Sequence, residues 1–296
     1  MVACHPISLE VRPSRPLVTI GLSIYNAEST LASAVKSIVA QTYQEWELLL
    51  LEDGSRDASL NVARNFSDDR IMVVYDGQNR GLSARLNQAV KMARGKYFCR
   101  MDQDDIAFPH RLEKQVEVLE AHPDIDLVAS SVVVFRNDGS LSGVVEIPET
   151  HQDLCRHPWG GFYMPHPTWM GKTGWFLTHP YSSEADGAED QVLLYSTFRE
   201  SRFSGIPEVL LGYRENERSF DKMLSRRLTF WRAIAGKAIE RGQWVDVVLL
   251  CLIQPLKIAG DFLNAGIGVA GPRNSLLAVN SLTESAWLKI WRGTHS

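Results

Sequence analysis

Between residues 17 and 101 the chain alternates short apolar runs, rich in β-branched residues, with segments whose apolar residues recur every three or four positions. The runs have the length of strands and the segments have the period of amphipathic helices. Strands joined by helices form right-handed crossovers, which give a mainly parallel sheet with helices on both faces. The alternation therefore predicts an α/β fold. The predicted strands are 17–25, 46–52, 71–75 and 96–101.

The second half of the chain has a less regular pattern. Residues 126–136 and 141–147 predict a pair of strands joined at the turn Asn137-Asp138-Gly139. A stretch rich in proline, glycine, histidine and tryptophan follows at 157–175 and predicts loops. From residue 222 onward the pattern becomes helical, so we expect a helical extension to the end of the chain.

Charge is distributed unevenly along the 296 residues. Residues 1–221 hold 21 lysines and arginines against 31 acidic residues (21 − 31 = −10), whereas 222–296 hold 10 against 4 (10 − 4 = +6). The two parts are therefore expected to meet different surroundings. The whole chain carries a net charge of only −4, which lacks the basic excess that phosphate-backbone binding favours, so we expect no nucleic-acid partner.

The cysteines and the N-terminal residues favour a cytoplasmic protein. Cys4, Cys99, Cys155 and Cys251 show no C-x-x-C spacing, which argues against a zinc ribbon or a disulfide scaffold. The first residues contain no apolar stretch of signal-peptide length, and no window of about 18 residues is free of charges and helix breakers. We therefore expect neither secretion nor a membrane span.

Two acidic clusters follow predicted strands directly. Glu52–Asp57 comes after the second strand, and Met101–Asp105 comes after the fourth. Such residues often only cap helices, but ligands of open parallel sheets bind beyond the carboxyl ends of the strands, and two clusters at one edge favour a binding site. Asp102 and Asp104, two positions apart, can converge on Mg²⁺ or Mn²⁺ together with phosphate oxygens. No P-loop and no G-x-G-x-x-G turn supports another nucleotide fold.

At this point the sequence resembles the family 2 inverting glycosyltransferases with the GT-A fold. The resemblance covers residues 16–220 and is carried by five blocks in order. They read VTIGLSIYNAESTLASAVKSIVAQTYQEWELLLLEDGSRD, NRGLSARLNQAVKMARGKYFCRMDQDDIAFPHRLEKQV, MPHPTWM, AEDQVLLYSTF and IPEVLLGYRENERS. One such motif is weak, but the ordered series implies a GT-A domain at 16–221. Within it the resemblance implies a nucleotide-binding half (16–108) and an acceptor-binding half (109–221), with an N-terminal extension at 1–15 and a basic helical extension at 222–296.

The resemblance also implies roles for individual residues. Ser23 would line the nucleotide pocket, and Asp53 would accept a hydrogen bond from the base, which in this family is usually uracil. Arg80 would meet the nucleotide or its diphosphate. Asp102 and Asp104 match the first and last positions of the D-x-D motif. Asp104 is then the expected ligand of Mn²⁺ or Mg²⁺, and Asp102 would lie closer to the ribose or sugar; Asp105 would be a neighbour or the cap of the next helix.

Asp190 matches the general base of the family. It lies with Glu189 at the start of a predicted helix, where negative charge is also favourable for the helix itself. As general base it would take the proton of an acceptor hydroxyl while the metal stabilises the departing nucleoside diphosphate, and a single displacement inverts the anomeric carbon. Glu189 is the alternative base.

Some positions depart from the family pattern. Glu52 stands where relatives have a first aspartate, and the late segment Tyr213-Arg214-Glu215-Asn216 lacks a histidine, so Glu215 or Asn216 would have to replace it as a metal ligand. His166 is expected either to shape the acceptor side or to serve as a buried structural residue. Three tryptophans could stack on sugars, although burial is their commoner role: Trp159, Trp169 and Trp175.

The extension after residue 221 allows two interpretations. Its basic balance and its exposed-looking tryptophans indicate helices that lie on the anionic inner face of the cell membrane. Alternatively, the helices pack on the main domain or on a partner subunit. The tryptophans concerned are Trp231, Trp244, Trp287 and Trp291.

The expected function is transfer of a sugar from a nucleotide-sugar donor, with UDP as the expected nucleotide, to a glycan or lipid-linked acceptor in polysaccharide or glycolipid synthesis. A non-catalytic relative within a glycan-assembly complex is the alternative, but the joint presence of Asp53, Asp104 and Asp190 argues against it. A sugar-nucleotide nucleotidyltransferase would need a glycine-rich basic loop after the first strand, where this chain has Tyr25-Asn26-Ala27-Glu28.

Overall fold

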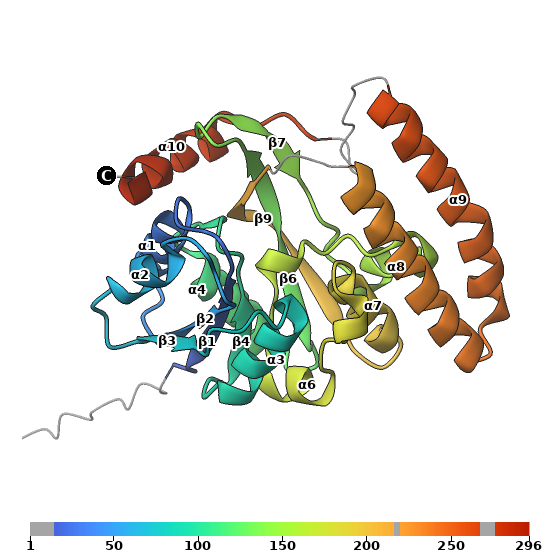
Figure 1. Cartoon of the computed structure of the whole chain (residues 1–296), viewed down its shortest axis with the longest axis horizontal. Coiled ribbons are helices and arrows are strands. Elements are labelled where there is room, and N and C mark those ends of the chain that lie inside the picture. The colour runs from blue at the N-terminus through green and yellow to red at the C-terminus, as the bar shows by residue number, and fades with distance from the viewer. Residues whose placement is uncertain (1–14, 216–219, 267–275, 296) are drawn as a thin grey trace, which may run out of the picture.

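The computed structural model describes residues 15–215, 220–266 and 276–295 of the chain, with a single mixed sheet at its centre (Figure 1). The strands follow the order β3-β2-β1-β4-β8-β6-β9-β5, and β7 pairs with β6. They are β1 Val18–Ile24, β2 Trp46–Glu52, β3 Ile71–Tyr75, β4 Tyr97–Arg100, β5 Ile106–Ala107, β6 Leu127–Phe135, β7 Leu141–Val145, β8 Met170–Lys172 and β9 Phe203–Arg214.

Helices cover both faces of this sheet. The α-helices are α1 Leu31–Val39, α2 Ser59–Arg64, α3 Leu82–Met92, α4 Arg111–Ala121, α5 His151–Leu154, α6 Thr173–Thr178, α7 Glu189–Thr197, α8 Phe220–Glu240, α9 Trp244–Gly266 and α10 Ser281–His295. Short 3-10 helices are η1 Pro158–Gly160, η2 His166–Thr168 and η3 Ser183–Ala185. The α/β class and all four predicted N-terminal strands are confirmed.

Strand β2 shows why the sheet must be covered twice. Every residue of β2 is buried, as expected for a central parallel strand. Leu48 and Leu50 pack in the cluster that contains α1 and α4, whereas Leu49 and Leu51 pack in the cluster that contains α3. Because successive side chains of a strand point to opposite faces, an uninterrupted leucine run serves two cores at once.

Strand direction brings four loops to one edge of the sheet. Strands β3, β2, β1 and β4 pair in parallel, so the loops that follow them leave from the same side. Strand β6 runs in that direction too, because β8 pairs antiparallel with both β4 and β6. The predicted pair at 126–136 and 141–147 forms β6 and β7, which are antiparallel as expected. Strands β5 and β8 are only two and three residues long, too short to leave a pattern in the sequence.

Helix α10 overturns one expectation about the C-terminal extension. Trp287 is fully buried, not exposed: its ring lies 4.6 Å from that of Phe135, and its indole nitrogen donates to the carbonyl oxygen of Gly139 at 2.8 Å. Gly212 makes this packing feasible, because a Cβ there would lie 2.3 Å from the indole ring. Since α10 covers β5, β6 and β7, which lie far away in the sequence, the helical pattern alone could not reveal the contact.

Helices α8 and α9 lie antiparallel at the right of Figure 1. Phe230 and Ile234 of α8 pack with α7 in the large core cluster. Asp246 of α9 is buried and accepts hydrogen bonds from the Tyr195 hydroxyl at 2.8 Å and from Arg199 at 2.9 Å. The extension therefore packs on the main domain, as one of the two interpretations expected. Among the described helices, none carries an apolar stretch of the length that crossing a bilayer requires.

Candidate active site

The loop after β1 and the loop after β4 are fastened to each other. Gln103, the middle residue of the D-x-D motif, accepts from the Tyr25 amide at 2.6 Å and donates to the Tyr25 carbonyl at 3.0 Å. Asn26 has a φ of 50°, a left-handed conformation that asparagine tolerates, and its side chain accepts from the Arg56 amide at 2.9 Å. Ser23 lies half-buried near the end of β1. Three neighbouring loop ends are therefore joined by hydrogen bonds into one continuous rim.

Asp53 holds the loop that follows β3. Its carboxylate accepts from the amides of Arg80 at 2.7 Å and Gly81 at 3.0 Å, and from the side chain of Arg85 at 2.7 Å. Gly81 has a φ of 84°, which glycine adopts without strain. The expected contact of Asp53 with a nucleotide base remains a prediction. The geometry adds a second role, because the same carboxylate fixes the backbone of Arg80.

Arg85 is a site residue that the sequence argument missed. It is fully buried and bridges Asp53 to Asp76, whose carboxylate accepts from Arg85 at 2.7 Å. That hydrogen bond is the main cause that lowers the pKa of Asp76 to about 2. Arg80, half-exposed, pairs with the other oxygen of Asp76 at 2.7 Å. A charged residue among the buried positions of α3, beside Leu86 and Ala89, was the available signal.

Asp102, Asp104 and Asp105 form a carboxylate cluster in which one oxygen of each lies within 4.8 Å of the others. Asp105 is nearly fully buried; one oxygen accepts from the Arg214 amide at 2.9 Å, and the other has no hydrogen-bond partner within the described residues. Burial, and then the charges of Asp102 and Asp104, raise the pKa of Asp105 well above its usual value. Hard oxygen ligands gathered around an unsatisfied buried oxygen fit a divalent cation. Asp105 thus joins Asp104 as a candidate ligand.

Two arginines hold this cluster from either side. Arg100, buried at the end of β4, donates to Asp102 at 2.9 Å and forms a second contact with that carboxylate at 2.5 Å. Arg214, at the end of β9, donates from its side chain to the Asp104 carbonyl at 2.8 Å. A buried arginine inside an apolar strand was the sequence signal for Arg100. Arg214 belongs to the last of the five family blocks, IPEVLLGYRENERS, and its hydrogen bonds connect that block to the D-x-D motif.

The pair Glu189-Asp190 begins α7, and its two members differ in environment. Glu189 is buried, accepts from the Gly187 amide at 2.7 Å and lies 3.5 Å from Nδ1 of His166. Burial raises the pKa of Glu189, but the hydrogen bond and charge of His166 outweigh it and hold that pKa below its usual value. Asp190 is only partly buried and accepts from Gln191 at 3.0 Å. This geometry favours Asp190 over Glu189 as the accessible base.

A buried tyrosine, Tyr181, feels the charges of both the candidate base and the D-x-D motif. The Tyr181 hydroxyl lies 3.0 Å from Nε2 of His166. Burial raises the pKa of Tyr181, the charge of Arg100 opposes that rise, and the charges of Glu189, Asp190 and Asp102 add to it. The fold therefore brings Asp102 and Asp190 to one region, although 88 positions separate them in the sequence (190 − 102 = 88). His166 is a buried member of this network.

Other expected contacts do not form. Glu215 accepts from the Ser142 hydroxyl at 2.7 Å and so does not join the carboxylate cluster, while Asn216 lies outside the described residues. Trp169 and Trp175 are buried in the core and cannot stack on a sugar; Trp159 is partly buried. The tryptophans fill volume that the irregular loops of this half leave between the helices.

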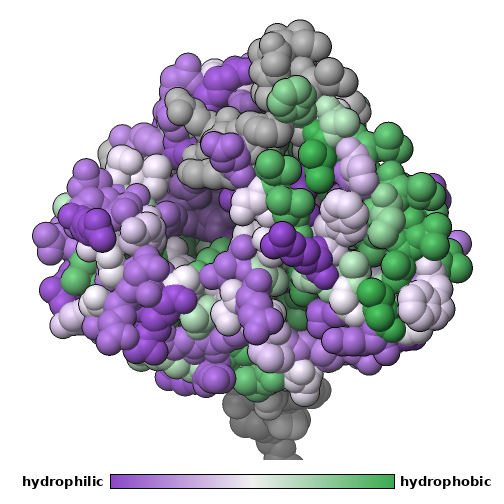
Figure 2. Space-filling view, turned by 45° about the vertical axis from the view of Figure 1, so that its right-hand side comes forward, coloured by the Kyte–Doolittle hydropathy of each residue, from purple (hydrophilic) through white to green (hydrophobic). Residues whose placement is uncertain are grey.

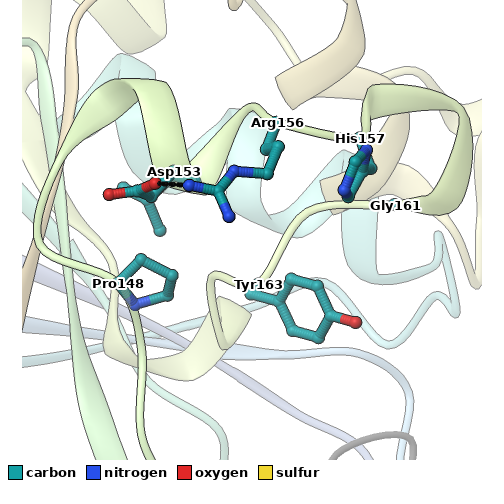
Figure 3. Close-up of a pocket in the computed structure, with 7 residues that line it drawn as sticks. Pro148, Asp153, Arg156, His157, Gly161 and Tyr163 are labelled. Atoms are coloured by element: carbon teal, nitrogen blue, oxygen red, sulfur yellow. Dashed lines mark hydrogen bonds and ion pairs between the residues drawn. The ribbon is translucent and has the colours of Figure 1, made fainter.

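A separate pocket of about 290 Å³ is lined by residues between 148 and 163, and Figure 3 shows the Arg156–Asp153 pair at its wall. None of the expected site residues lines it. Its neighbour Phe162 is nevertheless tied to Gln191, whose side chain accepts from the Phe162 amide at 2.7 Å. Gln191 also donates to Asp190. Its side chain therefore links Phe162, which follows the pocket residue Gly161, to the candidate base. The lining residues are Pro148, Asp153, Leu154, Arg156, His157, Gly161 and Tyr163.

Comparison with known proteins identifies the family of the chain. The profile of glycosyl transferase family 2 matches residues 19–176. EpsE of Bacillus subtilis (strain 168) is 41% identical over 129 residues, which cover 43% of this chain and 46% of EpsE. The chain thus matches about half the length of that relative. An Escherichia coli protein, named UDP-Glc:alpha-D-GlcNAc-diphosphoundecaprenol beta-1,3-glucosyltransferase WfgD, is 36% identical over 192 residues, covering 64% of this chain and 73% of WfgD.

A solved structure supports the fold. The mannosyltransferase PcManGT of Pyrobaculum calidifontis, in complex with GDP-Man and Mn²⁺, superposes with a TM-score of 0.63 over 95% of this chain and 82% of its own, at 17% identity. The expected GT-A fold is confirmed. The roles expected of Ser23, Asp53, Arg80, Asp102, Asp104 and Asp190, and the domain limits, remain predictions.

Proposed function

Because the chain belongs to glycosyl transferase family 2, we propose that it is an inverting enzyme that transfers a sugar from a nucleoside-diphosphate sugar to an acceptor hydroxyl. One observation supports the proposal above the others: the charges of Asp102, in the D-x-D motif, and of the partly buried Asp190 both raise the pKa of the buried Tyr181, whose hydroxyl lies 3.0 Å from His166. Donor and acceptor chemistry can therefore meet at one place.

The donor would bind along the rim formed by the loops after β1 to β4. Ser23, Asp53 and Arg80 stand on the nucleotide side of this rim, and Asp102, held by Arg100, would face the ribose or sugar. Asp104 and Asp105 would hold Mg²⁺ or Mn²⁺. A bound divalent cation supplies charge neutralisation to the leaving diphosphate.

Asp190 would act on the acceptor. It takes the proton from the acceptor hydroxyl, the oxygen attacks the anomeric carbon, and the bond from that carbon to the diphosphate oxygen breaks, with its electron pair leaving on the diphosphate. Glu189 does not compete for this task, because it is buried against His166 and fixes the start of α7. A single displacement of this kind inverts the anomeric configuration.

The donor and acceptor classes rest on the relatives. The name of WfgD specifies a UDP-linked glucose and a sugar carried on diphosphoundecaprenol. We therefore propose a UDP-sugar donor and a glycan or lipid-linked acceptor, in polysaccharide or glycolipid synthesis. A lipid-linked acceptor would bring the enzyme to the inner face of the cell membrane as a peripheral protein.

A thermal-shift panel tests the donor, because a ligand that binds only the folded state raises its stability by mass action. The full chain is heated with UDP-, GDP-, CDP- and dTDP-sugars, each with and without Mn²⁺. We expect stabilisation by UDP-sugars in the presence of Mn²⁺. Release of nucleoside diphosphate that depends on a lipid-linked acceptor then separates a transferase from a non-catalytic subunit. No donor binding, or no acceptor-dependent release, would contradict the proposal.

A further inference from the structure

Helix α9 presents an apolar face to solvent. Its exposed residues recur every third and fourth position, so they form one stripe along the helix. The large members of this stripe are between 57% and 72% exposed: Trp244, Val245, Val248, Leu252, Leu256 and Phe262. Every other described side chain of α9 that is exposed is also apolar or a cysteine. Figure 2 shows hydrophobic residues gathered on the right-hand side of the molecule, where α9 lies.

Contacts on the opposite side of α9 fix this orientation. Leu250 is fully buried in the core cluster shared with α8, and Asp246 is held by Tyr195 and Arg199. Gln254 donates to the Trp159 carbonyl at 2.8 Å, and Lys257 donates to the Gly160 carbonyl at 2.6 Å. Asp246, Gln254 and Lys257 of α9 thus face the protein, so the helix cannot rotate to bury its stripe without losing these contacts.

An exposed apolar stripe of this size is uncommon on a monomer and marks an interaction surface. The chemistry of the stripe favours lipid. It holds no charged side chain, and Trp244 at its start is of the type that gathers at membrane interfaces. Residues 222–266, which comprise most of α8 and all of α9, contain seven lysines and arginines against three acidic residues, and Arg226, Arg232 and Arg241 among them are exposed. An apolar face with basic surroundings complements an anionic bilayer.

We propose that α9 lies flat on an anionic lipid bilayer, with the stripe inserted at the level of the lipid headgroups. This proposal rests on the proposed function, which places the enzyme at the membrane as a peripheral protein. It assigns the membrane contact to one face of α9 and attributes binding to insertion of apolar side chains. It assigns α10 no part, because Trp287 is buried against the sheet. Gln254 and Lys257 contact η1, so the acceptor half would then lie next to the bilayer. Phe162 of this half is hydrogen-bonded to Gln191, which lies beside Asp190.

Vesicle sedimentation of the full chain tests the proposal without donor or acceptor. The protein is mixed with vesicles of equal parts phosphatidylcholine and phosphatidylglycerol, or of phosphatidylcholine alone. The test variant is Val248→Ser with Leu252→Ser and Leu256→Ser. The matched control is Leu177→Ser with Leu282→Ser, two exposed leucines of α6 and α10. Circular dichroism and a UDP-sugar thermal shift check that each variant is folded.

We expect binding of the wild type and the control to the anionic vesicles, and partition of the test variant lower by at least about tenfold, since three apolar side chains lose their transfer free energy. Binding of the wild type should weaken but persist in high salt, because insertion is not screened. A folded test variant that binds as well as wild type overturns the proposal. So does a wild type that ignores vesicles but forms a dimer in light scattering that the test variant abolishes; the stripe would then join two copies.

Transfer to a water-soluble acceptor is measured separately for the same variants. The proposal predicts that the test variant retains this activity, because the stripe touches none of the donor or base residues. Loss of vesicle binding with retained transfer therefore supports both proposals. Vesicle binding by a wild type that transfers no sugar would leave the surface assigned and contradict the proposed function alone.

Discussion

The proposed donor side and the proposed acceptor side of the site are built by different means. On the donor side, four parallel strands deliver their loops to one edge, and the loops are pinned by short contacts to backbone amides, as Asp53 and Gln103 show. On the proposed acceptor side, Asp190 is the second residue of a nine-residue helix, α7, that follows irregular chain, and side chains such as His166 and Tyr181 organise its surroundings. Regular topology therefore supplies the donor edge, whereas long-range side-chain pairs supply the acceptor side.

The sharpest way to separate the two sides is Asp190→Asn. We expect the rate of sugar transfer to fall by about 10²- to 10⁴-fold, because an asparagine cannot take the proton of the acceptor hydroxyl in the transition state. Donor binding should stay close to normal, since Asp190 belongs to the acceptor side. Initial rates with a competent acceptor and thermal shift with donor measure the two effects. Turnover within a few-fold of wild type would mean that another residue is the base. Glu189→Gln, measured in parallel, shows whether that residue is Glu189.

Arg85→Met tests whether the donor edge depends on a buried ion pair. Because it leaves the buried Asp53 carboxylate without its positively charged partner, we expect the free energy of unfolding to fall by about 3 to 5 kcal/mol. The control is Arg80→Met: Arg80 pairs with the same Asp76 but is half-exposed, so its loss should cost about 1 kcal/mol or less. Urea unfolding followed by circular dichroism measures both. Equal destabilisation by the two variants would show that burial of Arg85 contributes nothing special.

Asp104→Asn removes one charge from the carboxylate cluster while keeping the shape of the side chain. Loss of even an outer partner of a metal ligand costs about 10- to 100-fold in affinity, and we expect at least that loss in Mn²⁺-dependent binding of donor. The fold should persist, and binding measured without metal should hardly change. Titration calorimetry with UDP-sugar in Mn²⁺ and in a chelator measures the difference. Equal metal-dependent binding by wild type and variant would contradict the ligand assignment.

The same contrast explains what the sequence could predict. The run from 17 to 101 shows both periods clearly, so the strands, their parallel pairing and the edge that carries Asp53 and Asp104 follow from local pattern. The contacts of Arg85 and Arg214 depend on where distant segments meet, and no local period encodes that. Trp287 shows the same limit, because its helical spacing fits exposure and burial equally well until Phe135 and Gly212 lie against it.

Glu189→Gln should change how the stability of the protein depends on pH, through a single buried carboxyl group on the proposed acceptor side. The groups that face Glu189 are His166, Arg100 and the Gly187 amide, and together they hold its pKa below the value of the unfolded chain. A carboxyl whose pKa is lowered on folding contributes stability above its unfolded pKa of about 4.3, and this contribution disappears as the pH falls through the folded pKa. Each unit of pKa difference corresponds to about 1.4 kcal/mol. The melting temperature of wild type should therefore exceed that of Glu189→Gln at neutral pH, and the difference should shrink below pH of about 4. Glu184→Gln, an exposed neighbour, should show neither effect. A gap between wild type and Glu189→Gln that stays constant on acidification would mean that Glu189 holds α7 by its shape and not by its charge.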